Sequence, residues 1–190
     1  MHKRSSIWRW TSGAILIVIA LTGLAQIPTP KHVNIPVIPA RPEDVSSPEA
    51  IVKAGFDCES GPVGAPRQWA RERTLYDPAT IAVSAGPEFS TGSLKPRRFT
   101  FQQYVDQYDD YFVRNGSTDR PLGCVTNRRA YVATVTCGYE YSERGKVQER
   151  GVDIFQLYND GSRWWILGVV WDKESQDREY LKIVCSPSVA

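Results

Sequence analysis

The residue of this chain best suited to chemistry is an aspartate in an apolar stretch, Asp153 in GVDIFQLY (151–158). Burial disfavours the charged form of a carboxyl group, so an aspartate in an apolar cavity would have a raised pKa. A carboxyl group with a pKa near neutrality can accept or donate a proton during a reaction. Asp153 is therefore the candidate acid or base. Its alternative role is structural, at a sheet edge or paired with an arginine.

Aromatic residues are the second group that could build a site. Ligand pockets are lined mostly by apolar and aromatic side chains with a few polar groups. Aromatic residues at regular spacing also serve simply as core, and the wall of a pocket can be part of the core, so both roles stay open. The candidates for lining a pocket around an apolar or ring-shaped ligand are Tyr104, Tyr108, Tyr139, Asp153, Trp164 and Trp171.

Metal and cofactor chemistry is not expected. The sequence has no Cys-x-x-Cys motif, and its two histidines, His2 and His32, precede the part that should fold. A zinc site or a thioredoxin-type redox motif would need cysteines or histidines at closer spacing. A net charge of +2, from 23 Lys and Arg against 21 Asp and Glu, also argues against a nucleic-acid partner.

The four cysteines suggest disulfide bonds, because an even number in an exported chain permits them. A Cys58–Cys185 bond would fasten the C-terminal tail to the first helix. A Cys124–Cys137 bond requires neighbouring strands whose register places the two residues side by side. We expect a turn near residues 127–128, which would put Cys124 opposite Tyr131 and leave this bond the less secure of the two.

Three helices should position these residues. Ser46 and Glu49 have the spacing of a capping box and predict a helix near 48–59. A short helix should follow within 66–76. The third, near 101–113, has Thr100 and Gln103 as its capping pair and presents an apolar face at helical spacing. That face comprises Phe101, Tyr104, Val105, Tyr108, Tyr111 and Phe112.

The second half of the chain is predicted to be strands. Residues 131–141 alternate between apolar and polar types, and 150–158 and 163–172 flank a tight Asn-Asp-Gly-Ser turn. A short strand is expected in 80–86 and a loop in 86–98. The fold class is therefore α+β, with a cone-shaped curved antiparallel sheet that wraps about three helices.

The N-terminal region predicts export. Residues 2–9 are basic, and residues 10–30 carry no charge. This pattern is typical of a signal peptide, with a candidate cleavage site after Ala25, or of a membrane-anchoring hydrophobic helix over residues 8–27. The proline-rich segment that follows would suit a spacer. We therefore expect a signal or single-pass anchor in 1–27, a linker in 28–46, a folded domain in 47–175 and a tail in 176–190.

The ordered set of these segments resembles the nuclear transport factor 2-like superfamily, in its SnoaL-like form. The resemblance rests on EAIVKAGFDCESG, QWARERTLYDPATIAVSAG, TFQQYVDQYDDYF, YVATVTCGYEY and RGVDIFQLYNDGSRWWILGVVWDKES, which span roughly 47–175. It implies a cone fold that hosts isomerases, dehydratases, transport factors and binding modules. Many relatives have a histidine where this chain has Thr134, a departure that weakens the case for an enzyme.

The expected function is that of a non-catalytic module in the cell envelope that binds a small apolar ligand or an envelope protein. It would be anchored with the domain on the outer, periplasmic or extracellular, side or secreted. A homodimer through the sheet is a further expectation. One alternative is a small dehydratase- or isomerase-type enzyme that uses Asp153, and another is a periplasmic subunit of a secretion or envelope complex. An open cone with a buried Asp153 beside a tyrosine hydroxyl would favour the enzyme.

Overall fold

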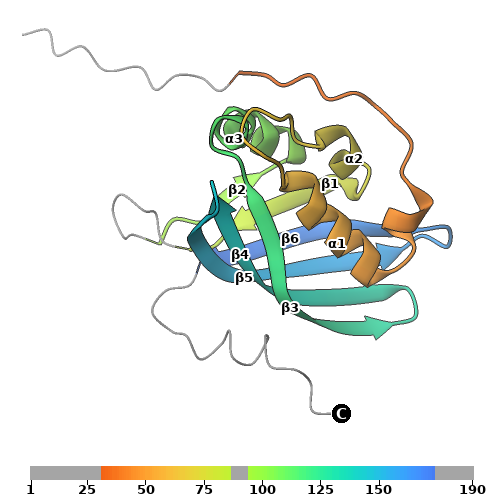
Figure 1. Cartoon of the computed structure of the whole chain (residues 1–190). Coiled ribbons are helices and arrows are strands. Elements are labelled where there is room, and N and C mark those ends of the chain that lie inside the picture. Colours follow the sequence, from red (N-terminus) through yellow and green to blue (C-terminus); the bar gives the residue numbers. More distant parts are fainter. Residues whose placement is uncertain (1–30, 87–93, 174–190) are drawn as a thin grey trace, which may run out of the picture.

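The computed structural model describes residues 31–86 and 94–173. The predicted signal or anchor of 1–27 and the tail of 176–190 lie outside these residues. Within them, a curved sheet carries the helices on one side (Figure 1). The elements in chain order are a 3-10 turn Pro42–Val45, α1 Pro48–Glu59, α2 Trp69–Arg73, β1 Tyr76–Ser84, β2 Arg97–Phe99, α3 Phe101–Asn115, β3 Thr118–Arg129, β4 Val132–Glu143, β5 Lys146–Asn159 and β6 Trp164–Lys173.

The sheet has six strands in the order β2-β1-β6-β5-β4-β3. Strands β3 to β6 form the antiparallel meander that the sequence predicts. The expectation of a wholly antiparallel sheet is wrong at one pair, because β1 runs parallel to β6. Parallel neighbours need a long connection, and here α3 and the first three strands of the meander lie between β1 and β6 in sequence.

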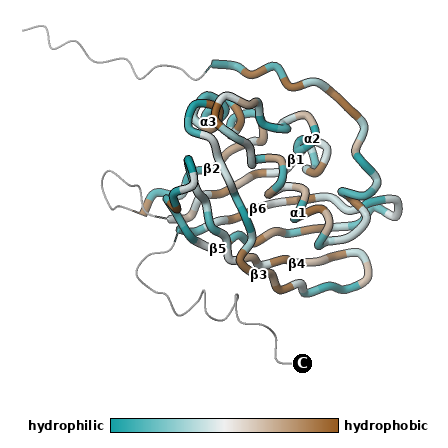
Figure 2. Tube along the Cα trace, viewed as in Figure 1, coloured by the Kyte–Doolittle hydropathy of each residue, from teal (hydrophilic) through white to brown (hydrophobic). Residues whose placement is uncertain are grey.

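Side chains cap the N-termini of α1 and α3. Ser47, one residue later than predicted, is the N-cap of α1, and its Oγ accepts a hydrogen bond from the Ala50 amide at 3.1 Å. Thr100 and Gln103 form the predicted capping box of α3. Along α3 the hydropathy changes from brown to teal within each turn (Figure 2), as expected for a helix with one face on the protein. None of the helices within 31–86 and 94–173 is both long and apolar enough to cross a bilayer.

Two strands were not anticipated from the sequence. Strand β2 lies in the segment predicted as a loop, and β3 occupies residues that precede the first predicted strand of the meander. Both lie at the edges of the sheet. An edge strand has a neighbour on one side only, so it tolerates the proline, glycine and charged residues that hide it in the sequence.

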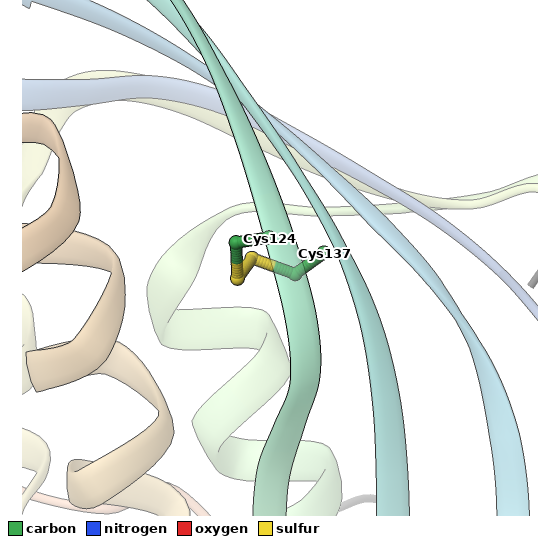
Figure 3. The surroundings of a disulfide bond; sticks show 2 residues. All are labelled: Cys124 and Cys137. Carbon is green, nitrogen blue, oxygen red and sulfur yellow. A yellow bond between two sulfur atoms is a disulfide. The ribbon is translucent and has the colours of Figure 1, made fainter. Parts of the chain in front are cut away.

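A disulfide joins the two strands at one edge of the sheet (Figure 3). The β3–β4 hairpin turns after Arg129, which pairs with Val132, and not near 127–128 as expected. The later turn brings Cys124 directly opposite Cys137, and the two are bonded. A bond across 13 residues removes about 3 kcal/mol of chain entropy from the unfolded state. Cys58 is buried in α1 without a disulfide partner among the described residues, and Cys185 lies outside them.

The core lies between the concave face of the sheet and α1. Ile51 and Val52 of α1 pack with apolar residues of β4, β5 and β6, including Val135, Phe155 and Ile166. Helix α3 contributes to a second apolar cluster and contacts β1 and β2 at the other end of the sheet. Because the two helices cover different parts of the concave face, a space remains between them.

Candidate functional site

That space is a cavity of about 590 Å³. Its walls come from α1, α2, α3 and all six strands, so every element of the cone contributes to it. A volume in this range suits one small organic molecule. The cone is therefore open, and its aromatic residues do not plug it.

Five of the six residues predicted to line a pocket do so: Tyr104, Tyr108, Tyr139, Asp153 and Trp171. The sixth, Trp164, is wrong as a lining residue. It is a core residue, 2% exposed, and the Arg128 guanidinium lies 5.1 Å from the centre of its ring. Trp164 begins β6, about 23 Å along the strand from Trp171 at a rise of about 3.3 Å per residue, so the two tryptophans cannot share one small cavity.

Asp153 occupies the middle of the concave face. It lies on β5, between Cys137 of β4 and Trp171 of β6, so its strand is paired on both sides. Within the described part of the chain, its carboxyl group has no hydrogen bond and no ion pair. The structural alternatives, a place at a sheet edge or a pair with an arginine, do not apply. Thr134, by contrast, is exposed and does not line the cavity, so its departure from the family pattern carries no information about catalysis.

Five further carboxyl groups that the sequence analysis missed line the same cavity, and one of them, Glu143, is bonded by tyrosine hydroxyls and set apart from the other four. The other four and Asp153 form what we term the acidic cluster: Glu59 of α1, Glu72 of α2, Asp119 of β3, and Glu149 and Asp153 of β5. The sequence contains signals for some of them. Glu59 follows Gly55 and Phe56 at helical spacing. Glu149 and Asp153 differ by four positions on one strand and therefore share its face.

Local hydrogen bonds bring the members of the cluster together. An isolated bridge pairs Gly61, just after α1, with Ser117, just before β3. The Ser60 hydroxyl bonds the Asp119 backbone in both directions, at 2.9 and 3.1 Å. These contacts place the end of α1, with Glu59, against the start of β3, with Asp119. The Gln68 amide donates to the Cys58 carbonyl at 3.1 Å, which in turn sets α2, with Glu72, against α1.

Burial raises the pKa of four members of the cluster, and repulsion from neighbouring carboxylates adds to the rise for three of them. The pKa of Glu59 rises to about 7 through burial, although a hydrogen bond from the Tyr104 hydroxyl at 2.9 Å opposes the rise. Burial and the charge of Glu59 raise the pKa of Glu72. Burial, followed by nearby carboxylates, likewise raises the pKa of Asp119 and of Asp153. Glu59, Asp119 and Asp153 keep some accessible surface because they border the cavity, but protein surrounds them closely enough for burial to dominate.

Two oxygens of the cluster are buried without a partner in the described structure. They are Oε2 of Glu72 and Oδ1 of Asp119. Leaving a buried acceptor unsatisfied costs about 1–3 kcal/mol. Glu72 is only 1% exposed, and it lines the cavity. The fold thus keeps an unsatisfied polar group at the cavity wall.

Gly151 leaves room for the Tyr139 side chain to extend over β5, close to Asp153. The Tyr139 hydroxyl donates a hydrogen bond of 2.5 Å to Glu149 Oε1, and Glu149 also pairs with Lys173. The Tyr139 ring reaches this position across Gly151, where a Cβ atom would come within 2.7 Å of it. Lys173 thus pairs with Glu149. Among the described residues, no basic side chain forms an ion pair with any of the other four carboxyl groups of the cluster.

Aromatic rings form another part of the wall, next to the carboxyl groups. We use the term aromatic wall for Tyr76, Phe101, Tyr104, Tyr108, Phe112 and Trp171, which all line the cavity. The centroids of Tyr104 and Tyr108 are 4.9 Å apart, and Tyr104 meets Trp171 edge-to-face at 6.1 Å. Such contacts fix the rings in place. The cavity thus combines rigid aromatic surfaces with carboxyl groups.

No family model and no curated protein matches the sequence. Solved structures do match the fold. A protein of unknown function with a cystatin-like fold from Nostoc punctiforme aligns with a TM-score of 0.52 at 6% identity, over 72% of this chain and 96% of that one. A nuclear transport factor 2-like protein from Streptomyces avermitilis, for which dehydratase activity has been suggested, gives 0.51 at 11% identity, over 70% and 96%.

Bd1075 of Bdellovibrio bacteriovorus aligns with a TM-score of 0.50 at 13% identity, over 68% of this chain and 40% of that one. At such low identity these matches bear on the fold and not on the activity. The arrangement of helices over a curved sheet agrees with the resemblance found in the sequence. The described domain therefore has the nuclear transport factor 2-like, or cystatin-like, cone fold.

Proposed function

We propose that this domain binds one small, ring-bearing organic molecule inside its cone. The observation that carries the proposal is the cavity of about 590 Å³, which is lined both by the aromatic wall and by carboxyl groups with unpartnered oxygens. Aromatic surfaces supply most of the affinity in such pockets, and a few polar groups fix the orientation of the ligand. A cone closed by its own side chains would have served only as a scaffold.

Gly55 offers a way to fill the cavity without disturbing the fold. It lines the cavity from the middle of α1, and a Cβ atom there would meet no other heavy atom within 4 Å. Because glycine is a poor helix former, Gly55→Ala should stabilise the domain by about 1 kcal/mol. Gly55→Leu should be folded as well, and its side chain should occupy the space that a ligand needs.

The test is a thermal-shift screen of ring-bearing small molecules, with each hit measured by calorimetry on both variants. We expect hits whose affinity falls at least tenfold in Gly55→Leu and changes little in Gly55→Ala. The absence of any hit, or hits that bind Gly55→Leu as well as the unchanged chain, would refute the proposal.

A second candidate function is that of a small dehydratase- or isomerase-type enzyme. Asp153 favours it, because this carboxyl group faces an open cavity and burial raises its pKa, as a general base requires. However, the nearby Tyr139 hydroxyl is engaged by Glu149. The same screen separates the two functions. A binding protein returns each hit unchanged, whereas an enzyme converts it, and Asp153→Asn would abolish the conversion.

We also propose that the domain works outside the cytoplasm, in the cell envelope. The basic start and the uncharged run of residues 10–30 support this location. The Cys124–Cys137 bond supports it independently, since such bonds persist mainly in oxidising compartments. Cell fractionation should find the protein in the membrane or exported fraction, with the two cysteines linked in a non-reducing peptide map. Recovery from the cytosol with both thiols free would count against export.

A further inference from the structure

The charges around the cavity are strongly unequal. Among the described residues that line it, six are acidic and two are basic. The acidic ones are the acidic cluster and Glu143, and the basic ones are Arg97 and Lys173. Lys173 pairs with Glu149, and the Arg97 guanidinium lies 5.6 Å from the centre of the Phe99 ring. Burial keeps protons on several of these carboxyl groups, so they ionise readily only beside a positive charge, and an anionic ligand would oppose that ionisation.

The unpartnered oxygens indicate that the ligand carries hydrogen-bond donors as well as a positive charge. Oε2 of Glu72 and Oδ1 of Asp119 have no hydrogen-bond partner, and each becomes an acceptor once its carboxyl group ionises. Glu72 is 1% exposed and lines the cavity, so a partner for Oε2 has to come from within it. A ligand with N–H groups and a positive charge would donate hydrogen bonds to these oxygens and would also stabilise the ionised carboxyl groups.

The aromatic wall suits the same ligand. Ring faces attract cations, most strongly where water is excluded. Tyr104 connects the two parts of the cavity, because its hydroxyl bonds Glu59 while its ring contacts Tyr108 and Trp171. A cationic head held at the carboxyl groups would therefore leave an attached apolar ring against the aromatic wall.

We propose that the cavity binds a protonated amine, one that bears at least one N–H and is carried on an apolar ring, with Glu72 and Asp119 as acceptors for its ammonium group. This inference rests on the proposed ligand-binding function and names its ligand class. A quaternary ammonium is the wrong head group, because it has charge but no hydrogen to donate. Glu59 and Asp153 complete the negative surroundings of the ammonium.

The first test compares three probes that share an indole ring: tryptamine, its N,N,N-trimethyl derivative and tryptophol. Calorimetry at pH 7 should show tryptamine binding at least tenfold more tightly than either of the others. Tryptophol is neutral, so it isolates the contribution of the ring. The trimethyl derivative keeps the charge and removes the donors.

The second test crosses these probes with two variants. Glu72→Gln keeps the shape of the side chain but cannot ionise when an ammonium group binds, so it should reduce the preference for tryptamine over tryptophol at least fivefold. Glu140→Gln is the matched control. Glu140 lies outside the cavity lining, held by Arg120 and Arg150 at 2.7 and 2.5 Å, and its replacement should leave the preference unchanged. Because the readout is a ratio of two affinities, partial misfolding of a variant cannot produce it.

Proton release provides a separate readout. An ammonium among carboxyl groups favours their ionised forms, so binding should expel protons. Calorimetry of tryptamine in buffers of different ionisation enthalpy should detect this release, and tryptophol should show none.

The two proposals fail in different ways. If tryptophol binds as well as tryptamine, and Gly55→Leu blocks both, the cavity binds ligands but the amine inference is wrong. If Glu72→Gln leaves the preference intact, Glu72 is not the acceptor and the inference is equally wrong. If none of the three probes binds while the wider screen finds neutral hits, the inference is overturned and the proposed function stands.

Discussion

The domain is expected to lose stability as the pH rises from 5 to 7, the reverse of ordinary acid denaturation. Glu59, Glu72, Asp119 and Asp153 all have a pKa raised above its usual value in the folded state, with that of Glu59 at about 7. A carboxyl group of this kind favours folding fully below its unfolded pKa, because the folded state holds the proton more tightly. The benefit is lost as the pH rises through the folded pKa.

The size of this effect follows from the number of protons. Each proton that only the folded state retains changes the free energy of unfolding by about 1.4 kcal/mol per pH unit. One proton retained across two pH units amounts to about 3 kcal/mol, so the four groups together should cost at least that much between pH 5 and pH 7. Urea unfolding followed by tryptophan fluorescence at a series of pH values would measure it.

Single substitutions provide the controls for the pH series. Glu72→Gln and Asp153→Asn each remove one titrating group, so each should flatten the slope between pH 5 and 7 and raise stability at pH 7. Glu140→Gln should do the opposite at pH 7. Hydrogen bonds from Arg150 and Arg120 lower the pKa of Glu140, so its benefit is present above its unfolded pKa and lost as the pH falls. A stability that stayed flat or rose from pH 5 to 7 would show that the cluster is ionised in the folded state.

The helices and the meander were predictable because their determinants are local. Thr100 and Gln103 cap α3 within four residues, and the Asn-Asp-Gly-Ser turn fixes the β5–β6 hairpin. The two edge strands were not predictable in the same way. Strand β3 has no steady alternation of buried and exposed residues, because it contacts only one neighbour. The pairing of β1 with β6 joins parts of the chain that are far apart in sequence, so it forms only when the whole cone folds.

The residues of the site also differ in how far they could be predicted from their immediate sequence neighbours. Asp153 stood out because its immediate neighbours are apolar. Glu59, Glu72 and Asp119 lie in segments rich in charge, where a carboxyl group is ordinarily solvated. The convergence of Glu59 and Asp119 depends on the Gly61–Ser117 bridge, which joins residues 56 positions apart (117 minus 61). No spacing within a single element records such a contact.

Gly151→Ala is expected to destabilise the domain by about 4 kcal/mol or more. A Cβ atom at this position would lie 2.2 Å from the carbonyl oxygen of Asp172 and 2.7 Å from the Tyr139 side chain. The first contact is with the backbone of the neighbouring strand, which cannot rotate away as a side chain can. Overpacking of a rigid site usually costs about 1–3 kcal/mol, and a clash with a paired strand should exceed that range.

Gly168→Ala is the matched control for this substitution, because Gly168 lies inside β6 and its nearest contacts for a Cβ atom are ordinary ones, at 3.8 and 3.9 Å. It should change stability by less than about 1 kcal/mol. Gly151→Ala combined with Tyr139→Ala should recover only part of the loss, since the clash with Asp172 remains. Urea unfolding of the four proteins at pH 5, where the acidic cluster is most protonated, separates this packing effect from titration. If Gly151→Ala proved as stable as Gly168→Ala, then β5 and β6 could separate there at little cost. The Tyr139 ring would not then need the glycine to reach Glu149.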